Sequence, residues 1–214
     1  MGRHATKFPG IFVEYDETKD LYFRLSVNEA LEQIAKKPIG ARLLHEIAGS
    51  NPASAADGYK VLIHAPDKRE FTQAGYSHPV FGNMVQDGSP CTASMLNRGA
   101  CDNANAADNV TDSETSGRGS TTKVRWNSNI TTLRLTSDQV PPFICLAHEL
   151  IHAHHCLYGT KKPNARTINH PQGGQMTIGE EEFYTVGVRG FEKEPITENK
   201  LRGEWRIKAR DDYP

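Results

Sequence analysis

Short runs of apolar residues that alternate with polar ones mark the strands expected in this chain. They cover residues 11–15, 21–25, 59–64, 121–127 and 129–135. Turn-forming Asp, Asn and Gly residues separate the runs, which favours β-structure. We expect the first two runs to form one hairpin across a turn at 16–20, and the last two to form another.

Apolar positions spaced three and four residues apart predict several helices. They cover residues 26–37, 41–48, 143–158, 177–187 and a short segment after 195. Ser26, followed by Glu29, forms a capping-box pattern at the start of the first predicted helix. Asp138 is the N-cap expected for the 143–158 helix, with Pro141 and Pro142 in its first turn. Gly159 follows this helix at the position where glycine commonly ends helices.

Two segments lack either pattern. Residues from about 66 to 120 are rich in Gly, Ser, Asn, Asp and Thr, and a loop of this length is either functional or mobile. Residues 161–176 are also expected to form a loop. This combination of strands and helices predicts one α+β domain over residues 1–214, with a small mixed sheet.

The composition excludes several partners. Lys and Arg number 25 against 26 Asp and Glu, and no basic block stands out, so we expect no nucleic-acid partner. No apolar run approaches the roughly 20 residues of a transmembrane segment, and the N-terminus lacks the apolar core of a secretory signal.

Four cysteines are too few for a disulfide scaffold at this length. Cys91 and Cys101 share the polar stretch and are candidates to pair, although a reducing cytosol would keep them free. Cys145 and Cys156 flank the histidines of the central helix, and we expect them to be small core hydrophobes.

Residues 147–153 carry the chemistry. His148 and His152 lie four positions apart, so on a helix both side chains rise from one face and can close on one ion. Two imidazoles suit Zn2+ at about 2.0–2.1 Å, and Glu149 is placed to accept a proton from a water molecule beside the metal. This His-Glu-x-x-His pattern therefore predicts metal-assisted hydrolysis. The alternative is a surface helix that carries two histidines by chance.

A catalytic zinc usually has three protein ligands, and spacing alone leaves the third open. His155 shares the helix with the first two, but three ligands from one straight helix would splay around a tetrahedral ion. His170, in a loop, is a second candidate. The run Glu180–Glu182 on a second helix is the better one, although spacing does not say which glutamate coordinates.

The central motif resembles the zinc helix of the clostridial neurotoxin light chains. The shared residues are His148-Glu149-Leu150-Ile151-His152-Ala153, His155 and Leu157-Tyr158-Gly159. Residues 181–187, Glu-Glu-Phe-Tyr-Thr-Val-Gly, are similar to the Glu-Glu-x-x-Thr-x-Gly helix of the same toxins. This resemblance implies that Glu181 is the third zinc ligand and that Glu182 supports the site from outside the ligand set.

The chain is far shorter than those toxins, and its size and flanks are more similar to the NleD family of type III secreted effectors, which includes the HopH and XopG group. The resemblance covers most of the chain. It rests on residues 8–12, the zinc helix, Glu181-Glu182, Glu198-Asn199-x-Leu201-Arg202-x-Glu204 and Arg210-x-x-Tyr213. The family is implied to be zinc endopeptidases injected into host cells, where some members cut mitogen-activated protein kinases.

The resemblance to the toxins also implies roles near the C-terminus. Arg210 and Tyr213 are implied to stabilise the oxyanion of the tetrahedral intermediate, for which a guanidinium and a phenol are suitable donors. Glu198 lies at the distance before Arg210 where the toxins hold a supporting glutamate. The implied fold is a zincin-like metalloprotease fold, with a central His-Glu-x-x-His helix and a second helix that bears a ligand.

We therefore expect a zinc endopeptidase of the gluzincin type, monomeric, secreted by a bacterium into a host cell and active in the cytosol or nucleus. Its expected partner is a host protein, with a mitogen-activated protein kinase as the candidate. Two alternatives stay open: a zinc-containing binding protein that sequesters a host signalling protein without cutting it, and a hydrolase of a small amide. Glu149 favours an enzyme, because a binder has no use for a base beside the metal.

Overall fold

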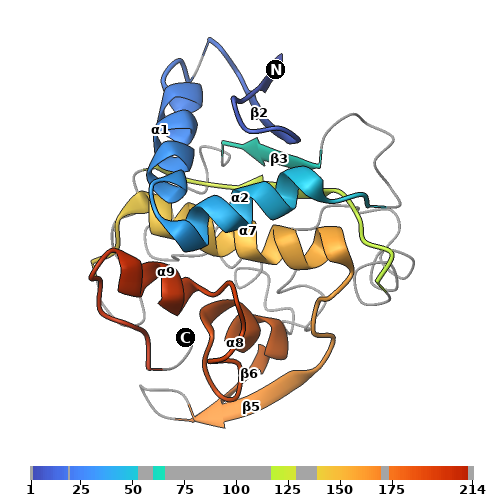
Figure 1. Ribbon diagram of the computed structural model, residues 1–214, viewed down its shortest axis with the longest axis vertical. Helices are drawn as coiled ribbons and strands as arrows, with labels where there is room; N and C mark the ends of the chain where they lie inside the picture. Colours follow the sequence, from blue (N-terminus) through green and yellow to red (C-terminus); the bar gives the residue numbers. More distant parts are fainter. Residues whose placement is uncertain are drawn as a thin grey trace.

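Helix α7 (Pro142–Tyr158) lies across the middle of the molecule, with the other elements on its two sides (Figure 1). On one side pack the elements that precede it: α1 (Phe23–Ala35), α2 (Pro38–Gly49) and a four-stranded sheet. On the other side pack α8 (Glu180–Val186), α9 (Glu198–Glu204) and the hairpin β5–β6. The computed structural model describes residues 2–18, 20–52, 60–65, 117–128, 139–169 and 174–211. Within these ranges, no helix is both long and apolar enough to cross a membrane.

The sheet is mixed, as expected. Its strands lie in the order β1 (Gly2–Ala5), β2 (Ile11–Tyr15), β3 (Val61–His64) and β4 (Thr122–Arg125). Strands β1 and β2 are antiparallel, whereas β2–β3 and β3–β4 are parallel. The strands predicted near 11–15, 59–64 and 121–127 are thus confirmed, but β2 pairs with residues 2–5 and not with 21–25. Residues 129–135, the expected partner of 121–127, lie outside the described part of the chain.

Helix α1 begins within residues 21–25, the segment predicted to be the second strand of the hairpin. It begins at Phe23, whereas the capping-box pattern predicts Ser26. Leu21 and Tyr22 are apolar but 66% and 70% exposed, while Phe23 and Val27 are buried. The four-residue spacing of the buried residues, which is typical of a helix, therefore begins at Phe23. Ser26 lies inside the helix, where its N–H donates to the Tyr22 carbonyl (3.0 Å).

Helices α2 and α7 both start with proline, which fits the first turn because its missing N–H needs no partner there. The N-terminus of α2 is capped from a distance: the Ile39 N–H donates to both carboxylate oxygens of Glu204, each at 3.1 Å. The N-cap of α7 is Pro141; Asp138, expected there, is outside the described residues. Gly159 ends α7 with a left-handed φ of 64°, as predicted.

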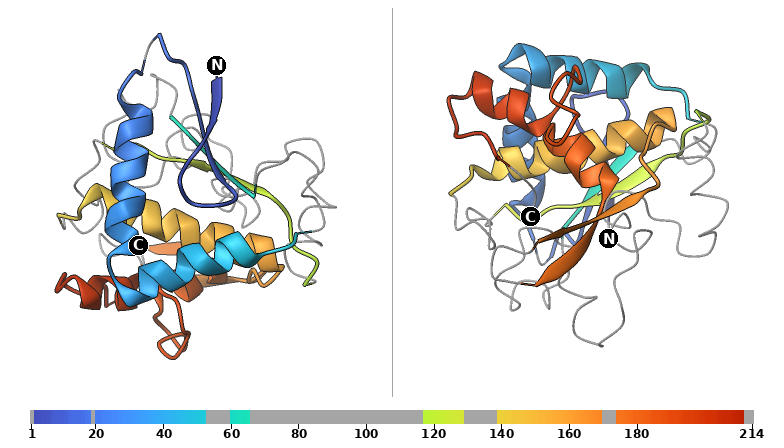
Figure 2. Two further views of the ribbon diagram at one scale, coloured as in Figure 1. Left: turned by 45° about the horizontal axis from the view of Figure 1, so that its top comes forward. Right: turned by 90° about the horizontal axis from the view of Figure 1, so that it is seen from below.

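The segment after α7 contains a hairpin that the sequence pattern does not reveal. Strands β5 (Ala165–Asn169) and β6 (Gln175–Gly179) pair antiparallel within the expected loop 161–176 and beyond it. Figures 1 and 2 show this hairpin beyond α8, on the side of α7 away from the four-stranded sheet. Helices α8 and α9 agree with the helices predicted before 187 and after 195.

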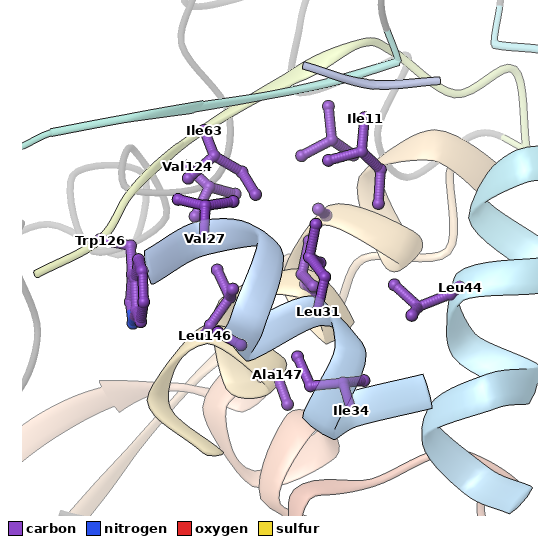
Figure 3. Close-up of a cluster of buried hydrophobic side chains, with 14 of the residues drawn as sticks. Ile11, Val27, Leu31, Ile34, Leu44, Ile63, Val124, Trp126, Leu146 and Ala147 are labelled. Carbon is purple, nitrogen blue, oxygen red and sulfur yellow. The ribbon is translucent and has the colours of Figure 1, made fainter. Parts of the chain in front are cut away.

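The main core lies between α1, α2, α7 and the sheet. Figure 3 shows side chains from all of these elements converging: Ile11, Val27, Leu31, Ile34, Leu44, Ile63, Val124, Trp126, Leu146 and Ala147. Burial of each such aliphatic side chain stabilises the folded state by about 1.5–3 kcal/mol. This packing fixes one face of α7, so that the opposite face can carry polar groups.

The chain before β4 is tied to the C-terminal end of α7. The Ser120 N–H donates to the Cys156 carbonyl at 2.9 Å. Gly119, next to it, has a φ of 70°, and a Cβ at this position would lie 1.9 Å from the Leu157 carbonyl oxygen. Glycine is required here both by conformation and by close approach.

Cys156 corrects one sequence-based expectation. It is fully buried, as a core hydrophobe would be, but it is disulfide-bonded. Cys145 is free and packs at the edge of the core. Cys91 and Cys101 lie outside the described residues.

Gly119→Ala should destabilise the protein more than Gly117→Ala. Both residues have positive φ (70° and 81°), but a Cβ at Gly117 has no neighbour within 4 Å. We expect the free energy of unfolding to fall by about 1–2 kcal/mol for Gly117→Ala, and by a further 1–3 kcal/mol or so for Gly119→Ala because of the clash. Urea unfolding of both variants measures this. Equal losses would show that Leu157 moves aside without cost.

Candidate metal centre

Two imidazoles on one face of α7 form the centre of the site. His148 and His152 are about one turn apart, and their Nε2 atoms lie 3.1 Å from each other. The residues are 6% and 3% exposed, and the ring planes meet at 80°. The helix thus brings the two Nε2 atoms to one point, as the four-residue spacing predicts.

A carboxylate from α8 completes a cluster with these imidazoles. Glu182 Oε2 lies 3.3 Å from the Nε2 of His148 and 3.3 Å from the Nε2 of His152. Glu182 is 1% exposed. Among the described residues, these three are the group whose ligand atoms are close enough to hold one metal ion.

The candidate cluster contains Glu182, whereas the resemblance to the toxins implies Glu181 as the ligand. Successive residues of an α-helix point about 100° apart, so only one of two neighbours can face α7 at the level of the Nε2 atoms. Which one does so depends on how α8 is rotated about its axis. The Glu-Glu sequence contains no information on that rotation.

Glu181 instead contacts the imidazole of His152 at Nδ1, on the side of the ring away from the cluster. Its Oε1 lies 3.1 Å from His152 Nδ1 and 2.6 Å from His155 Nδ1, and its Oε2 accepts the Lys162 N–H at 2.9 Å. The Thr185 hydroxyl lies 3.0 Å from His152 Nδ1 and 3.3 Å from Glu181 Oε1. Glu181 is completely buried, so these contacts replace the water that its carboxylate has lost.

Glu198 does the same for the other imidazole. Its Oε2 lies 2.7 Å from His148 Nδ1 and accepts from Arg210 Nη1 at 3.2 Å. Its Oε1 accepts from Arg202 Nε at 2.6 Å, and Arg202 Nη1 donates to the Lys208 carbonyl at 2.9 Å. Glu198 and Arg202 are 2% and 1% exposed. Glu198 thus contacts a histidine of the cluster without belonging to the cluster, and its supporting role stays a prediction.

The carboxylates create a strongly negative potential at the imidazoles. Burial by itself lowers the pKa of His152, but the Glu182 and Glu181 carboxylates outweigh it and raise the pKa to about 10. The pKa of His148 is also raised, because contacts with Glu182 and Glu198 outweigh burial. An environment that binds protons this tightly also favours a cation in their place.

The contacts of Glu181 and Glu198 lower their own pKa values well below the usual range. Burial opposes ionisation in both cases. For Glu181 the imidazoles of His155 and His152 outweigh it, and for Glu198 the Arg210 guanidinium and His148 do so. Both side chains are therefore carboxylates at neutral pH.

The cluster has the dimensions and the chemistry of a zinc site. Ligands held tetrahedrally at about 2.0–2.1 Å from Zn2+ lie roughly 3.3 Å apart. The three separations here are 3.1, 3.3 and 3.3 Å. Two imidazole nitrogens and one carboxylate oxygen are also a donor set that zinc accepts in catalytic sites.

The remaining sequence-predicted residues have mixed positions. Glu149 is 4% exposed and follows His148 on α7. His155 and Glu180 lie outside the cluster: His155 contacts a carboxylate through Nδ1, and Glu180 pairs with an arginine of β5. Tyr213 and His170 belong to the residues that the structure does not describe.

Sequence reasoning missed two groups that hold the site in place. Arg202 lies four residues after Glu198 on α9, a spacing typical of helical ion pairs, so this contact had a recognisable signal. Thr185 lies four residues after Glu181, but a hydroxyl at that spacing is too common to single out. Arg202 contacts the carboxylate of Glu198, and Thr185 contacts both the carboxylate of Glu181 and the Nδ1 of His152.

A family model named Peptidase_M91 and described as "Effector protein" matches residues 11–213. The chain belongs to the Peptidase_M91 family. No curated protein matches this Peptidase_M91 member.

Solved structures share its fold. The botulinum neurotoxin type D light chain aligns with a TM-score of 0.52 and 17% identity, over 92% of this chain and 58% of the toxin chain. The Clostridium botulinum neurotoxin serotype F light chain aligns with a TM-score of 0.55 and 16% identity, over 92% of this chain and 59% of the other. The Peptidase_M91 chain thus spans under two thirds of both light chains. The likeness confirms the predicted zincin-like α+β fold.

The buried Glu198–Arg202 pair should contribute much more to stability than an exposed pair of the same spacing. Arg42 Nε and Glu46 Oε1 on α2 are also four residues and 2.6 Å apart, but the Arg42 side chain is 52% exposed. We expect Arg202→Ala to lower the free energy of unfolding by about 3–5 kcal/mol, because it leaves a buried carboxylate poorly compensated. Arg42→Ala should cost about 0.3–0.5 kcal/mol. Urea unfolding of metal-free protein compares them, and similar losses would contradict this reading.

Proposed function

We propose that the chain is a zinc-dependent endopeptidase of the gluzincin type that acts as an effector in a host cell. The observation that carries this proposal is the cluster of His148 Nε2, His152 Nε2 and Glu182 Oε2, buried and mutually 3.1–3.3 Å apart. Membership in a peptidase family described as effector proteins supports both parts of the proposal.

His148, His152 and Glu182 are the proposed protein ligands of the zinc ion. Zinc bound there would polarise the scissile carbonyl and make a nearby water molecule more acidic. Glu181 and Glu198 accept the Nδ1–H of the two imidazoles, which leaves each Nε2 lone pair directed at the ion.

Glu149 is the proposed general base. It follows the first histidine on α7 and is buried, which supports a role next to the cluster. The carboxylate accepts a proton as water attacks the carbonyl carbon, and then delivers it to the leaving amine.

Arg210 is proposed to stabilise the negative charge that develops on the carbonyl oxygen. Its Nη1 contacts Glu198 Oε2 at 3.2 Å, and its side chain is 7% exposed, so the guanidinium is held against the carboxylate that contacts His148. A fixed cation in a buried site needs little reorganisation when the oxyanion forms. Tyr213, three residues on, is proposed as the second donor.

The proposed substrate is a host signalling protein, with a mitogen-activated protein kinase as the candidate. The proposed enzyme is a single-domain monomer over residues 1–214, delivered by a bacterium into host cytosol or nucleus. The family description supports the host as the place of action. The kinase assignment comes from the resemblance to the NleD group.

Glu149→Gln should retain zinc and lose peptidase activity. Removing a general base costs about 10²–10⁴-fold in rate, and the change is nearly isosteric. N-terminal labelling and mass spectrometry of host extract, treated with each protein with and without a chelator, measures new N-termini. His148→Ala is the control that should lose both metal and cleavage. If wild type and Glu149→Gln both bind zinc and neither creates new N-termini, the zinc-containing binding protein becomes the better account.

Glu182→Gln should weaken zinc binding more than Glu181→Gln. The first change replaces the proposed carboxylate ligand, whereas the second removes a group that orients a ligand and should cost about 10–100-fold. Competition with a coloured chelator gives both zinc dissociation constants. The reverse order would restore Glu181 as the ligand.

A further inference from the structure

The chain reverses direction directly after α9. The helix ends at Glu204, and Arg206 adopts a left-handed φ of 55°, a conformation that few non-glycine residues take up. The Ile207 N–H then donates back to the Arg202 carbonyl at 2.8 Å. Residues 207–211 therefore return along the helix that they have just left, which brings Arg210 to Glu198, the residue that contacts His148 Nδ1.

Asn199 holds the far end of this returning segment by its backbone. Its Oδ1 accepts the Arg210 N–H at 2.7 Å, and its Nδ2 donates to the Arg210 carbonyl at 2.8 Å. One side-chain amide thus satisfies both backbone groups of one residue, as a neighbouring strand would. The nearby contact from Arg202 Nη1 to the Lys208 carbonyl (2.9 Å) holds the same segment two residues earlier.

The residue held in this way is the one whose guanidinium reaches the site. Arg210 Nη1 contacts Glu198 Oε2, and Glu198 precedes Asn199 on α9. Two adjacent residues of one helix therefore fix Arg210 at both ends: Asn199 at the backbone and Glu198 at the guanidinium. The Asn199 contacts limit how far the backbone of Arg210 can move, and the ion pair with Glu198 restrains the far end of a long side chain that has many rotamers.

We propose that Asn199 is a positioning residue that sets the catalytic geometry of Arg210 through its backbone. The inference rests on the proposed endopeptidase function. Among the described residues, the side-chain hydrogen bonds of Asn199 go to the backbone of Arg210 and not to the cluster. Its loss should therefore slow the chemical step and leave both zinc affinity and substrate binding nearly unchanged.

Steady-state kinetics of zinc-loaded enzyme on a peptide substrate test the catalytic part. We expect Asn199→Ala to lower kcat about 10–100-fold with KM within about twofold, since small misplacements of a charged group are costly. Asn199→Asp keeps the acceptor for the Arg210 N–H and loses the donor, so its kcat should be intermediate. Asn28→Ala, on α1, is the matched control and should behave as wild type.

A double-mutant cycle separates positioning from a general structural effect. In an Arg210→Ala background, Asn199→Ala should have no further effect on kcat, because the group that it positions is gone. An equal drop in kcat in both backgrounds would overturn the proposal, as would a change in KM alone.

Amide hydrogen exchange tests the backbone contact without any reliance on activity. In Asn199→Ala, exchange at Arg210 should become faster while exchange in α7 and zinc affinity stay as in wild type. Unchanged exchange at Arg210 would overturn the proposal even in an active enzyme. If wild type cuts no substrate, the endopeptidase function fails, and the exchange result still decides whether Asn199 holds Arg210.

Discussion

Each histidine of the cluster is held at Nδ1 by a buried carboxylate, and the rest of the site depends on this contact. Glu198 and Glu181 take up opposite sides of the imidazole pair, at 2.7 and 3.1 Å. An imidazole that donates from Nδ1 has its free lone pair on Nε2, so both rings present an acceptor atom at the same point. Glu182 then needs only to reach that point from α8.

Buried carboxylates are costly, and the molecule places a partner on each one. Glu198 has two guanidiniums, of Arg202 and Arg210, and Glu181 has His155, a hydroxyl and a backbone N–H. Apart from His155, which lies on α7 itself, these partners come from parts of the chain that follow α7, whereas the core that fixes α7 comes largely from elements that precede it. The cluster thus lies where the two parts of the chain meet.

The sequence predicts those parts of the site that depend on one element. His148 and His152 share one helix, and a four-residue spacing is enough to place their side chains together. The choice between Glu181 and Glu182 depends on the rotation of α8 against α7, and neither helix encodes it by itself. Glu198 was found through a family resemblance, because no local pattern links residue 198 to residue 148.

The errors in the predicted fold also arise where the outcome depends on how elements pack together and not on one element alone. Leu21 and Tyr22 are apolar and were expected in a strand, but both face solvent ahead of α1. The hairpin β5–β6 was missed because its strands are short and rich in polar residues, so that buried residues such as Ile168 and Ile178 do not stand out as an alternating run. Burial, and not residue type, decides both cases.

The cap that Glu204 provides at Ile39 links positions 165 residues apart. The loop-closure entropy of such a contact must be overcome before the contact contributes any stability, so topologies rich in distant pairings fold slowly. The first turn of α2 therefore gains its cap late, after α9 has docked. A chain emerging from a ribosome would have its early helices and strands well before the carboxylates that orient the two imidazoles, so the proposed zinc ion could be bound only near the end of maturation.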